Sequence, residues 1–274
     1  MVKKLVASIL ISITVGGIIG GVGTYYLHNN KPKLNDTTLL AYNWLENSGE
    51  ASALEYQAYK TATDRVEQLA KVKTDKPKAV IMDIDETVVN NGDYLGWQIK
   101  NNKGYSKADY TEWINQNKAT AVDGAVAFTQ KCKELGIEVF YVSNRFEKED
   151  LKGTIANMDK LGLAYADAEH ILLVTDKSSK QARWDKVKAG HDVIMQVGDS
   201  LTDFSTQFEK KTVAQEKEEV KANANKFGTE YIIIPNPVYG NFESAIYNND
   251  LKKTDDQKLA DRWAGVQSTT ITAK

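Results

Sequence analysis

Two carboxylates two positions apart, Asp83 and Asp85, are the residues of this sequence best placed to do chemistry. They lie at the end of the apolar segment Ala79–Ile84, which we predict to be a buried strand. Residues i and i+2 share one face of a strand, so both acids could point into one site, whereas a turn would give them different roles. Two carboxylates in one pocket repel each other unless a cation or a proton relieves them. The pair therefore predicts a Mg²⁺ site.

Polar and cationic side chains follow two further apolar segments. Ser143, Asn144 and Arg145 offer a hydroxyl, an amide and a guanidinium, which are groups that bind anionic oxygens. Lys177 and Lys180 stand at the predicted start of a helix, where free backbone amides and the helix dipole favour a phosphate. Taken singly, Ser143 could cap a helix and either lysine could be a solvated charge.

A second pair of acids, Asp199 and Asp203, follows the apolar segment Val193–Val197. Asp199 is predicted to be a further oxygen ligand for Mg²⁺. An acid after a strand often caps a helix, so Asp203 alone would carry little weight. Ligands bind at the carboxyl ends of strands in parallel sheets. Because acids, hydroxyl and lysine all stand at such ends, we predict that they share one pocket.

The elements that position these residues are predicted from short apolar runs that alternate with amphipathic stretches from Lys76 onward. This alternation is typical of a parallel sheet between helices, so we predict an α/β fold of three layers with a smaller, mainly helical region attached. The predicted strands are Ala79–Ile84, Glu138–Ser143, Ile171–Val174, Val193–Val197 and Tyr231–Ile234. The predicted helices lie near Val122–Leu135, Lys148–Leu161, Ser178–Lys188 and Val213–Lys226.

Composition divides the chain into several parts. The segment 90–121 is too long for a simple strand-to-helix turn and is rich in Trp and Tyr, which predicts a cap over the site. The predicted parts are an N-terminal signal or anchor (1–28), a polar linker (29–36), a helical region packing on the core (37–75), the core with its cap insertion (76–266) and a flexible tail (267–274).

The N-terminal segment predicts a location outside the cytoplasm. Lys3 and Lys4 precede the uncharged run Leu5–Leu27, which is about as long as the roughly 20 residues that span a bilayer. No clear Ala-x-Ala cleavage site is visible, so an uncleaved membrane anchor is favoured over a released protein. The only cysteine, Cys132, excludes both a lipid-attachment site after this run and an internal disulfide.

The charge balance and the histidines exclude several functions. Lys and Arg total 35 and Asp and Glu total 37, so no basic excess exists to bind a nucleic-acid polymer. The histidines, His28, His170 and His191, form no HExxH or RHG motif, which argues against zinc proteases and histidine phosphatases. The expected partner is a small anionic molecule, and homo-oligomer formation is left open.

The order of the motifs resembles that of the haloacid dehalogenase (HAD) superfamily, in which DxDxT is followed by Ser or Thr, then Lys, then GDxxxD. More narrowly, the chain resembles the bacterial class C acid phosphatases, membrane-attached surface proteins that act on nucleoside monophosphates. The similarity runs from about Asp36 to Ala264. The segments that carry it are Val80–Tyr94 (VIMDIDETVVNNGDY), Val139–Arg145 (VFYVSNR), Asp176–Arg183 (DKSSKQAR), Ile194–Phe204 (IMQVGDSLTDF) and Ile234–Gly240 (IPNPVYG).

This resemblance implies the Rossmann-like HAD fold and a two-step phosphoryl transfer. Asp83 would attack phosphorus and form an aspartyl-phosphate. Asp85 would protonate the departing alkoxide and later take a proton from the attacking water, so activity is expected in mild acid. Mg²⁺ would be held by Asp83, the backbone carbonyl of Asp85 and Asp199.

The resemblance also implies how the substrate is held. Ser143 and Lys180 would bind phosphoryl oxygens, with Lys177 as the alternative, and Asp203 would orient the lysine. Asn144 and Arg145 are expected to help. By the same resemblance, Tyr110 and Tyr239 would sandwich the base or ring of a nucleotide or aryl phosphate, although either could be merely packed.

Two departures and two rival functions remain. Ser200 stands where relatives usually carry Asn or Thr, but a hydroxyl can make similar hydrogen bonds. The missing lipid-attachment Cys concerns the mode of attachment and leaves the chemistry unaffected. The rivals are a non-catalytic surface ligand-binding protein on the same fold and another phosphoryl transferase of the superfamily. Dehalogenation is disfavoured because it does not need Asp85.

Overall fold

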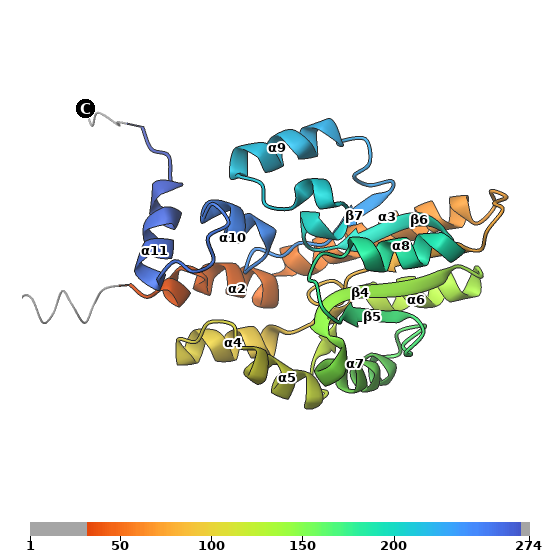
Figure 1. Cartoon of the computed structure of the whole chain (residues 1–274), viewed down its shortest axis with the longest axis horizontal. Coiled ribbons are helices and arrows are strands. Elements are labelled where there is room, and N and C mark those ends of the chain that lie inside the picture. The colour runs from red at the N-terminus through yellow and green to blue at the C-terminus, as the bar shows by residue number, and fades with distance from the viewer. Residues whose placement is uncertain (1–31, 270–274) are drawn as a thin grey trace, which may run out of the picture.

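A five-stranded sheet forms the centre of the structure, a computed structural model that describes residues 32–269 (Figure 1). Its strands are all parallel and lie in the order β5-β4-β1-β6-β7. Because β1 is central, the residues that follow it lie between the ends of β4 and β6. The bounds are β1 Lys78–Met82, β4 Glu138–Phe146, β5 Ile171–Val174, β6 Asp192–Gly198 and β7 Tyr231–Ile233.

Helices cover both faces of this sheet, which makes three layers. Val80 of β1 faces a core that contains Tyr59 and Phe128, whereas Ile81 faces a second core around Trp184. This alternation follows from the two-residue period of a strand. The first face is covered by α3 (Gly49–Leu69), α6 (Ala125–Glu134) and α7 (Glu147–Leu161), and the second by α8 (Gln181–Gly190). The predicted α/β fold is confirmed.

The segment predicted as a cap, 90–121, is a two-helix insertion between β1 and α6. The short strands β2 (Val89–Asn90) and β3 (Thr120–Ala121) pair antiparallel and close its base. Between them lie α4 (Gly92–Asn101) and α5 (Lys107–Asn115). Figure 1 shows these two helices, in yellow to olive, below the sheet, where α5 packs beside α7.

Residues near the two ends of the described chain contact each other. The predicted linker 29–36 is described only from residue 32, and its end is structured: η1 (Leu34–Thr37) is a 3₁₀ turn. Arg262 donates hydrogen bonds to the Leu34 carbonyl and to Thr37, and Asn35 donates to two carbonyls at the end of the α4 segment. The remaining helices and 3₁₀ turns of the described residues are α2 (Leu39–Asn47), η2 (Leu201–Asp203), η3 (Thr206–Phe208), α9 (Val213–Ala222), α10 (Asn241–Ile246) and α11 (Asp255–Ala264).

The two ends of the chain lie largely outside the described residues. This applies to the whole predicted signal or anchor, 1–28, and to most of the predicted tail, of which 267–269 form no helix or strand. Within residues 32–269, no helix is long and apolar enough to cross a membrane. Cys132 is a free, fully buried thiol, and burial raises its pKa to about 12.

Several predicted boundaries differ from the structure, and β1, for example, ends at Met82 and not at Ile84. The strand predicted to end at Ser143 continues to Phe146, with a shift of register against β5 after Val142. The helix predicted from Ser178 begins at Gln181. The helix predicted to reach Lys226 ends at Ala222, where α9 is followed by turns.

Candidate active site

A tight turn directly after β1 separates the two carboxylates of the first motif. The Asp83 amide donates to the Val197 carbonyl at 2.9 Å, which continues the pairing with β6. The Ile84 carbonyl then accepts from two amides four and five residues further on, each at 2.9 Å. Glu86 adopts a left-handed backbone conformation with φ 50° inside this turn. The turn therefore directs Asp83 and Asp85 toward different partners.

Asp83 lies against a buried lysine. The Lys180 Nζ is 2.7 Å from Asp83 Oδ1 and 2.7 Å from Asp203 Oδ1, and its side chain is 7% exposed. The other oxygen of Asp203 accepts from the Ser200 amide at 2.9 Å. Lys177, in contrast, is exposed. Lys180 stands at the position before α8, whereas the predicted helix Ser178–Lys188 included it.

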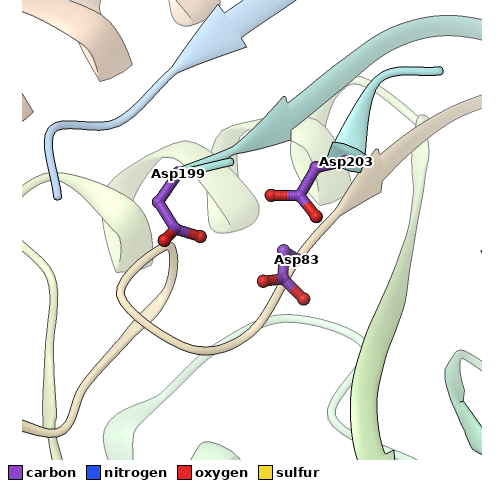
Figure 2. Close-up of side chains that lie close together, drawn as sticks. All are labelled: Asp83, Asp199 and Asp203. Carbon is purple, nitrogen blue, oxygen red and sulfur yellow. The ribbon is translucent and has the colours of Figure 1, made fainter. Parts of the chain in front are cut away.

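Asp199 completes an acidic cluster at the end of β6. It accepts hydrogen bonds from Thr87 at 3.2 Å and from Asn236 at 2.8 Å. One oxygen each from Asp83, Asp199 and Asp203 lie within 4.8 Å of one another. Figure 2 shows the three carboxylates turned toward a shared space. The side chain of Asp85 is not in this cluster, and Asp203 takes part in it as well as binding Lys180.

This cluster carries more negative charge than Lys180 neutralises. Burial raises the pKa of Asp83 to about 7; Lys180 opposes the shift, and the nearby Asp203 and Asp85 add to it. Burial, followed by Asp203 and Asp83, also raises the pKa of Asp199 well above its usual range. Such shifts report crowded, desolvated acids. Three hard oxygen ligands with uncompensated charge fit a hard divalent cation.

Asp85 has the opposite surroundings. Its Oδ1 accepts from Arg145 Nη2 at 2.6 Å, Tyr110 Oη at 2.5 Å and Asn91 Nδ2 at 3.0 Å. The Ser143 hydroxyl lies 3.4 Å from Oδ2. Burial acts to raise the pKa of Asp85, but the Arg145 guanidinium and the neutral donors outweigh it and hold the pKa below its usual range. Asp85 is therefore a paired, compensated acid.

Three residues predicted to bind the substrate bind other protein groups. Arg145 is 3% exposed, and besides Asp85 its guanidinium donates to Thr154 at 3.1 Å, so it supports Asp85 and is not free for a phosphate. The Tyr110 hydroxyl is likewise occupied by Asp85, although the residue still lines the cavity. The side-chain oxygen of Asn144 accepts from Arg183 at 2.9 Å.

Tyr239, the fourth residue predicted to bind the substrate, is connected by hydrogen bonds to Glu86 and Asn91, which the sequence analysis did not single out. Its hydroxyl donates to Glu86, which also accepts from the Asn91 amide group. Glu86 is 4% exposed and Asn91 is 1% exposed. Arg183 was also missed; its guanidinium donates to the carbonyls of Ser143, Ser178 and Ser179. The only sequence signal was their position in or next to the motifs.

All predicted site residues except the exposed Lys177 line one cavity of about 560 Å³. Its lining includes carboxylates, Lys180 and four tyrosines, so charged and aromatic surfaces face the same space. The predicted residues along it are Asp83, Asp85, Tyr110, Ser143, Asn144, Arg145, Lys180, Asp199, Asp203 and Tyr239.

Comparison with known families identifies this arrangement. The model of HAD superfamily subfamily IIIB, described as acid phosphatase, matches residues 30–242. The chain therefore belongs to the HAD subfamily IIIB acid phosphatases. The family predicted from the motifs is thus confirmed.

Solved structures place this acid phosphatase more narrowly. The class C acid phosphatase from Bacillus anthracis is similar at 36% identity and a TM-score of 0.83, over 87% of this chain and 100% of that chain. A second structure of class C acid phosphatase from the same organism, with tungstate bound, matches at 34% identity and the same TM-score and coverage. The enzyme is a class C acid phosphatase, that is, a phosphomonoesterase.

Proposed function

We propose that this acid phosphatase hydrolyses nucleoside monophosphates and aryl phosphates through an aspartyl-phosphate on Asp83, with Mg²⁺, outside the cytoplasmic membrane. One observation carries the proposal: Lys180 Nζ bridges Asp83 and Asp203 beside Asp199, in a cavity that tyrosines also line. A nucleophile, a fixed cation and a set of hard ligands are the parts that phosphoryl transfer requires.

The first step forms a bond between a carboxylate oxygen of Asp83 and phosphorus while the ester P–O bond breaks. The departing oxygen takes a proton from Asp85. Lys180 and Ser143 hold phosphoryl oxygens during the transfer. Asp83 and Asp199, with Asp203 or the Asp85 backbone carbonyl, would hold Mg²⁺, which supplies positive charge that keeps Asp83 ionised and offsets the charge of the phosphate.

The second step releases inorganic phosphate. Asp85, now a carboxylate, takes a proton from water as the water oxygen attacks phosphorus and the bond to Asp83 breaks. Arg145, which pairs with Asp85, stabilises this ionised form between the two steps. Burial acts to raise the pKa of Asp85, but Arg145 holds it below its usual range, so the protonated form that acts as the acid is favoured as the pH falls.

The cavity supports a planar leaving group. At about 560 Å³ it has room for more than a phosphate, and Tyr110 and Tyr239 bring aromatic surface to the space that contains the carboxylates. Stacking on such rings is worth about 1–3 kcal/mol per base and tolerates different bases. The tungstate complex of the similar Bacillus anthracis enzyme supports an oxyanion site in this fold.

The membrane location rests on the uncharged run at the N-terminus. We infer that the catalytic part stands outside the cell, held by segment 1–28. Cell fractionation with and without protease treatment of intact cells tests this: anchored enzyme should sediment with membranes and be released by the protease. Activity confined to the soluble cell interior would contradict the location but leave the chemistry standing.

The chemistry is tested by phosphate release from a panel of nucleotides and aryl phosphates at mildly acidic pH, with and without EDTA. We expect turnover that EDTA abolishes and Mg²⁺ restores. Asp83→Asn and Asp85→Asn should remove turnover of the nucleotides while circular dichroism remains that of a folded protein. Turnover that survives Asp83→Asn would rule out the covalent intermediate.

A further inference from the structure

Asn91 connects the catalytic turn to the cap insertion 90–121. Its Nδ2 lies 3.0 Å from Asp85 Oδ1 and 3.0 Å from Glu86 Oε1, and its Oδ1 accepts from Trp113 Nε1 at 2.9 Å. Its backbone amide donates to Glu86 Oε1 at 2.9 Å. Every polar atom of this amide side chain thus has a partner, although the residue is only 1% exposed.

The chemistry of Trp113 fixes which way the Asn91 amide points. An indole N–H can only donate a hydrogen bond, so the atom facing it must be the Asn91 oxygen. Both hydrogens of the Asn91 nitrogen are then directed at the carboxylates of Asp85 and Glu86. Trp113 belongs to α5, so the cap insertion determines this orientation.

The hydrogen bonds on Asp85 are unequal. Oδ1 accepts from Arg145 Nη2, Arg145 Nε, Tyr110 and Asn91, at distances between 2.5 and 3.0 Å. Oδ2 has only the longer contacts with Arg145 Nε at 3.3 Å and Ser143 at 3.4 Å. A carboxylate oxygen offers about two lone pairs. Oδ1 is therefore fully used, and Oδ2 is the oxygen left to carry a proton.

Glu86 holds Asn91 from the other side. It is 4% exposed, and while Oε1 accepts both Asn91 donors, Oε2 accepts from the Tyr239 hydroxyl. Its backbone is left-handed, with φ 50°, in the tight turn that follows β1. The catalytic turn, the cap and the loop after β7 thus meet in one buried set of hydrogen bonds.

We propose that Asn91, oriented by Trp113 and Glu86, is a positioning residue that reserves Oδ2 of Asp85 for proton transfer to the leaving group. This rests on the proposed role of Asp85 as the acid. In the step, the O–H bond at Oδ2 breaks and a new O–H bond forms on the leaving oxygen, which keeps the electron pair of the P–O bond. The carboxylate that remains is stabilised at Oδ1 by the donors already there.

Leaving groups of different basicity test the proposal. An alkoxide from a nucleoside 5′-monophosphate needs a proton to depart, whereas 2,4-dinitrophenolate does not. The value of kcat/KM covers only steps up to the first irreversible one, so it excludes hydrolysis of the aspartyl-phosphate. For Asn91→Ala, we expect kcat/KM to fall about 10²-fold with the nucleotide and much less with 2,4-dinitrophenyl phosphate.

A second variant and a control keep the test decisive. Trp113→Phe keeps an aromatic ring but removes the indole N–H donor, so the side-chain amide of Asn91 can turn. We expect kcat/KM with the nucleotide to fall about tenfold, and kcat/KM with 2,4-dinitrophenyl phosphate to fall much less. If Asn91→Ala does not fold, this variant alone gives the ratio. Asn90→Ala is the matched control, since the Asn90 amide contacts Glu46 instead of Asp85, and it should leave the ratio of the two substrates unchanged.

The outcomes separate the two levels of inference. If both variants slow the two substrates by the same factor, Asn91 is only structural and the proposal is wrong. If Asp85→Asn itself does not favour dinitrophenyl phosphate over the nucleotide, the proposed role of Asp85 fails first. A selective loss in Asn91→Ala and Trp113→Phe, with Asp85→Asn giving the largest selectivity, supports the proposal.

Discussion

Asp83 and Asp85 stand two positions apart in the sequence, yet their side chains have opposite surroundings. Asp83 shares Lys180 with Asp203 and lies beside Asp199, and burial raises its pKa to about 7. Asp85 is paired with an arginine and two neutral donors, and its pKa is lowered. The partners Lys180 and Arg145 lie 97 and 60 positions away in the chain. Distant segments therefore decide what each acid can do.

The two sets of partners come from different parts of the fold. Those of Asp83 stand at the ends of β6 and before α8, on the rim of the sheet. Those of Asp85 come from β4 and from the cap insertion, through Tyr110 and Asn91. The acids around Asp83 at the rim of the sheet keep a negative charge that a bound cation must offset. On the cap side, the protein's own donors balance the charge of Asp85.

The largest effect is expected from Lys180→Met. It removes the cation that faces Asp83 and the phosphoryl group, so kcat/KM should fall about 10³-fold, as when one transition-state donor is deleted. Steady-state phosphate release measures it. Lys177→Met is the matched control, because that side chain is exposed, and it should stay close to the parent. Equal losses in both lysine variants would contradict the assignment.

The second effect concerns stability on the cap side. Arg145→Met leaves Asp85 buried without its cation, which should lower the free energy of unfolding by about 3 kcal/mol. Urea denaturation measures it. Arg183→Met is the control, since Arg183 binds only carbonyls and an amide oxygen, and should cost about 1 kcal/mol. A small change in Arg145→Met would mean that the pair contributes little.

The third effect separates the two sides by their response to metal. Mg²⁺ at a hundredfold excess over its Kd should stabilise the parent by about 2.7 kcal/mol. Asp199→Asn should lose this gain, yet be more stable than the parent in EDTA because one of three repelling acids is gone. Thermal melting with Mg²⁺ or EDTA measures both. Arg145→Met should keep the gain; its loss there would show that the sides are not independent.

The smallest effect uses a buried acid outside both sets. Burial raises the pKa of Glu55 in α3 to about 7, although it accepts from the Asp123 amide at 3.2 Å, and nearby Asp123 and Glu46 add to the shift. With a folded pKa above the ordinary 4.5, its contribution to stability is full below that value and is lost as the pH rises through about 7.

Glu55→Gln should therefore be more stable than the parent at pH 8 by about 1–2 kcal/mol, with little difference near pH 4. This allows for partial screening of the roughly 1.4 kcal/mol per pKa unit. Urea denaturation at the two pH values checks it. If the stability difference between Glu55→Gln and the parent does not change with pH, burial without a nearby cation does not raise the pKa of Glu55.

The apolar periodicity of the sequence was sufficient for the sheet and its helices. Runs such as Ile171–Val174 match β5, because a strand buried on both faces must be continuously apolar. The same signal failed where chemistry begins. Arg145 was predicted to follow a strand that ends at Ser143, yet it belongs to β4 and is 3% exposed. Arg145 can be buried because it pairs with Asp85, and the periodicity of apolar residues gives no signal of an ion pair.

The candidate site shows the same division. Motif spacing selected Asp83, Lys180 and Asp199, which the structure brings together. Arg145 was assigned to the substrate because of its type and position, and Tyr110 because of the family resemblance, but the guanidinium and the hydroxyl each donate to Asp85. A cationic or phenolic side chain suits a phosphate ester and a carboxylate equally well. Only the path of the chain in space decides between them.

The single cysteine, Cys132, has a practical consequence for placing labels on the cap insertion. Cys132 lies on the buried face of α6 with no exposed surface, and its pKa of about 12 keeps it protonated and unreactive at ordinary pH. A cysteine introduced on α4 or α5 would then be the sole site for a thiol-directed fluorophore or spin label in the described part of the chain. A label there would test whether the insertion 90–121 moves during turnover, without first removing a native cysteine.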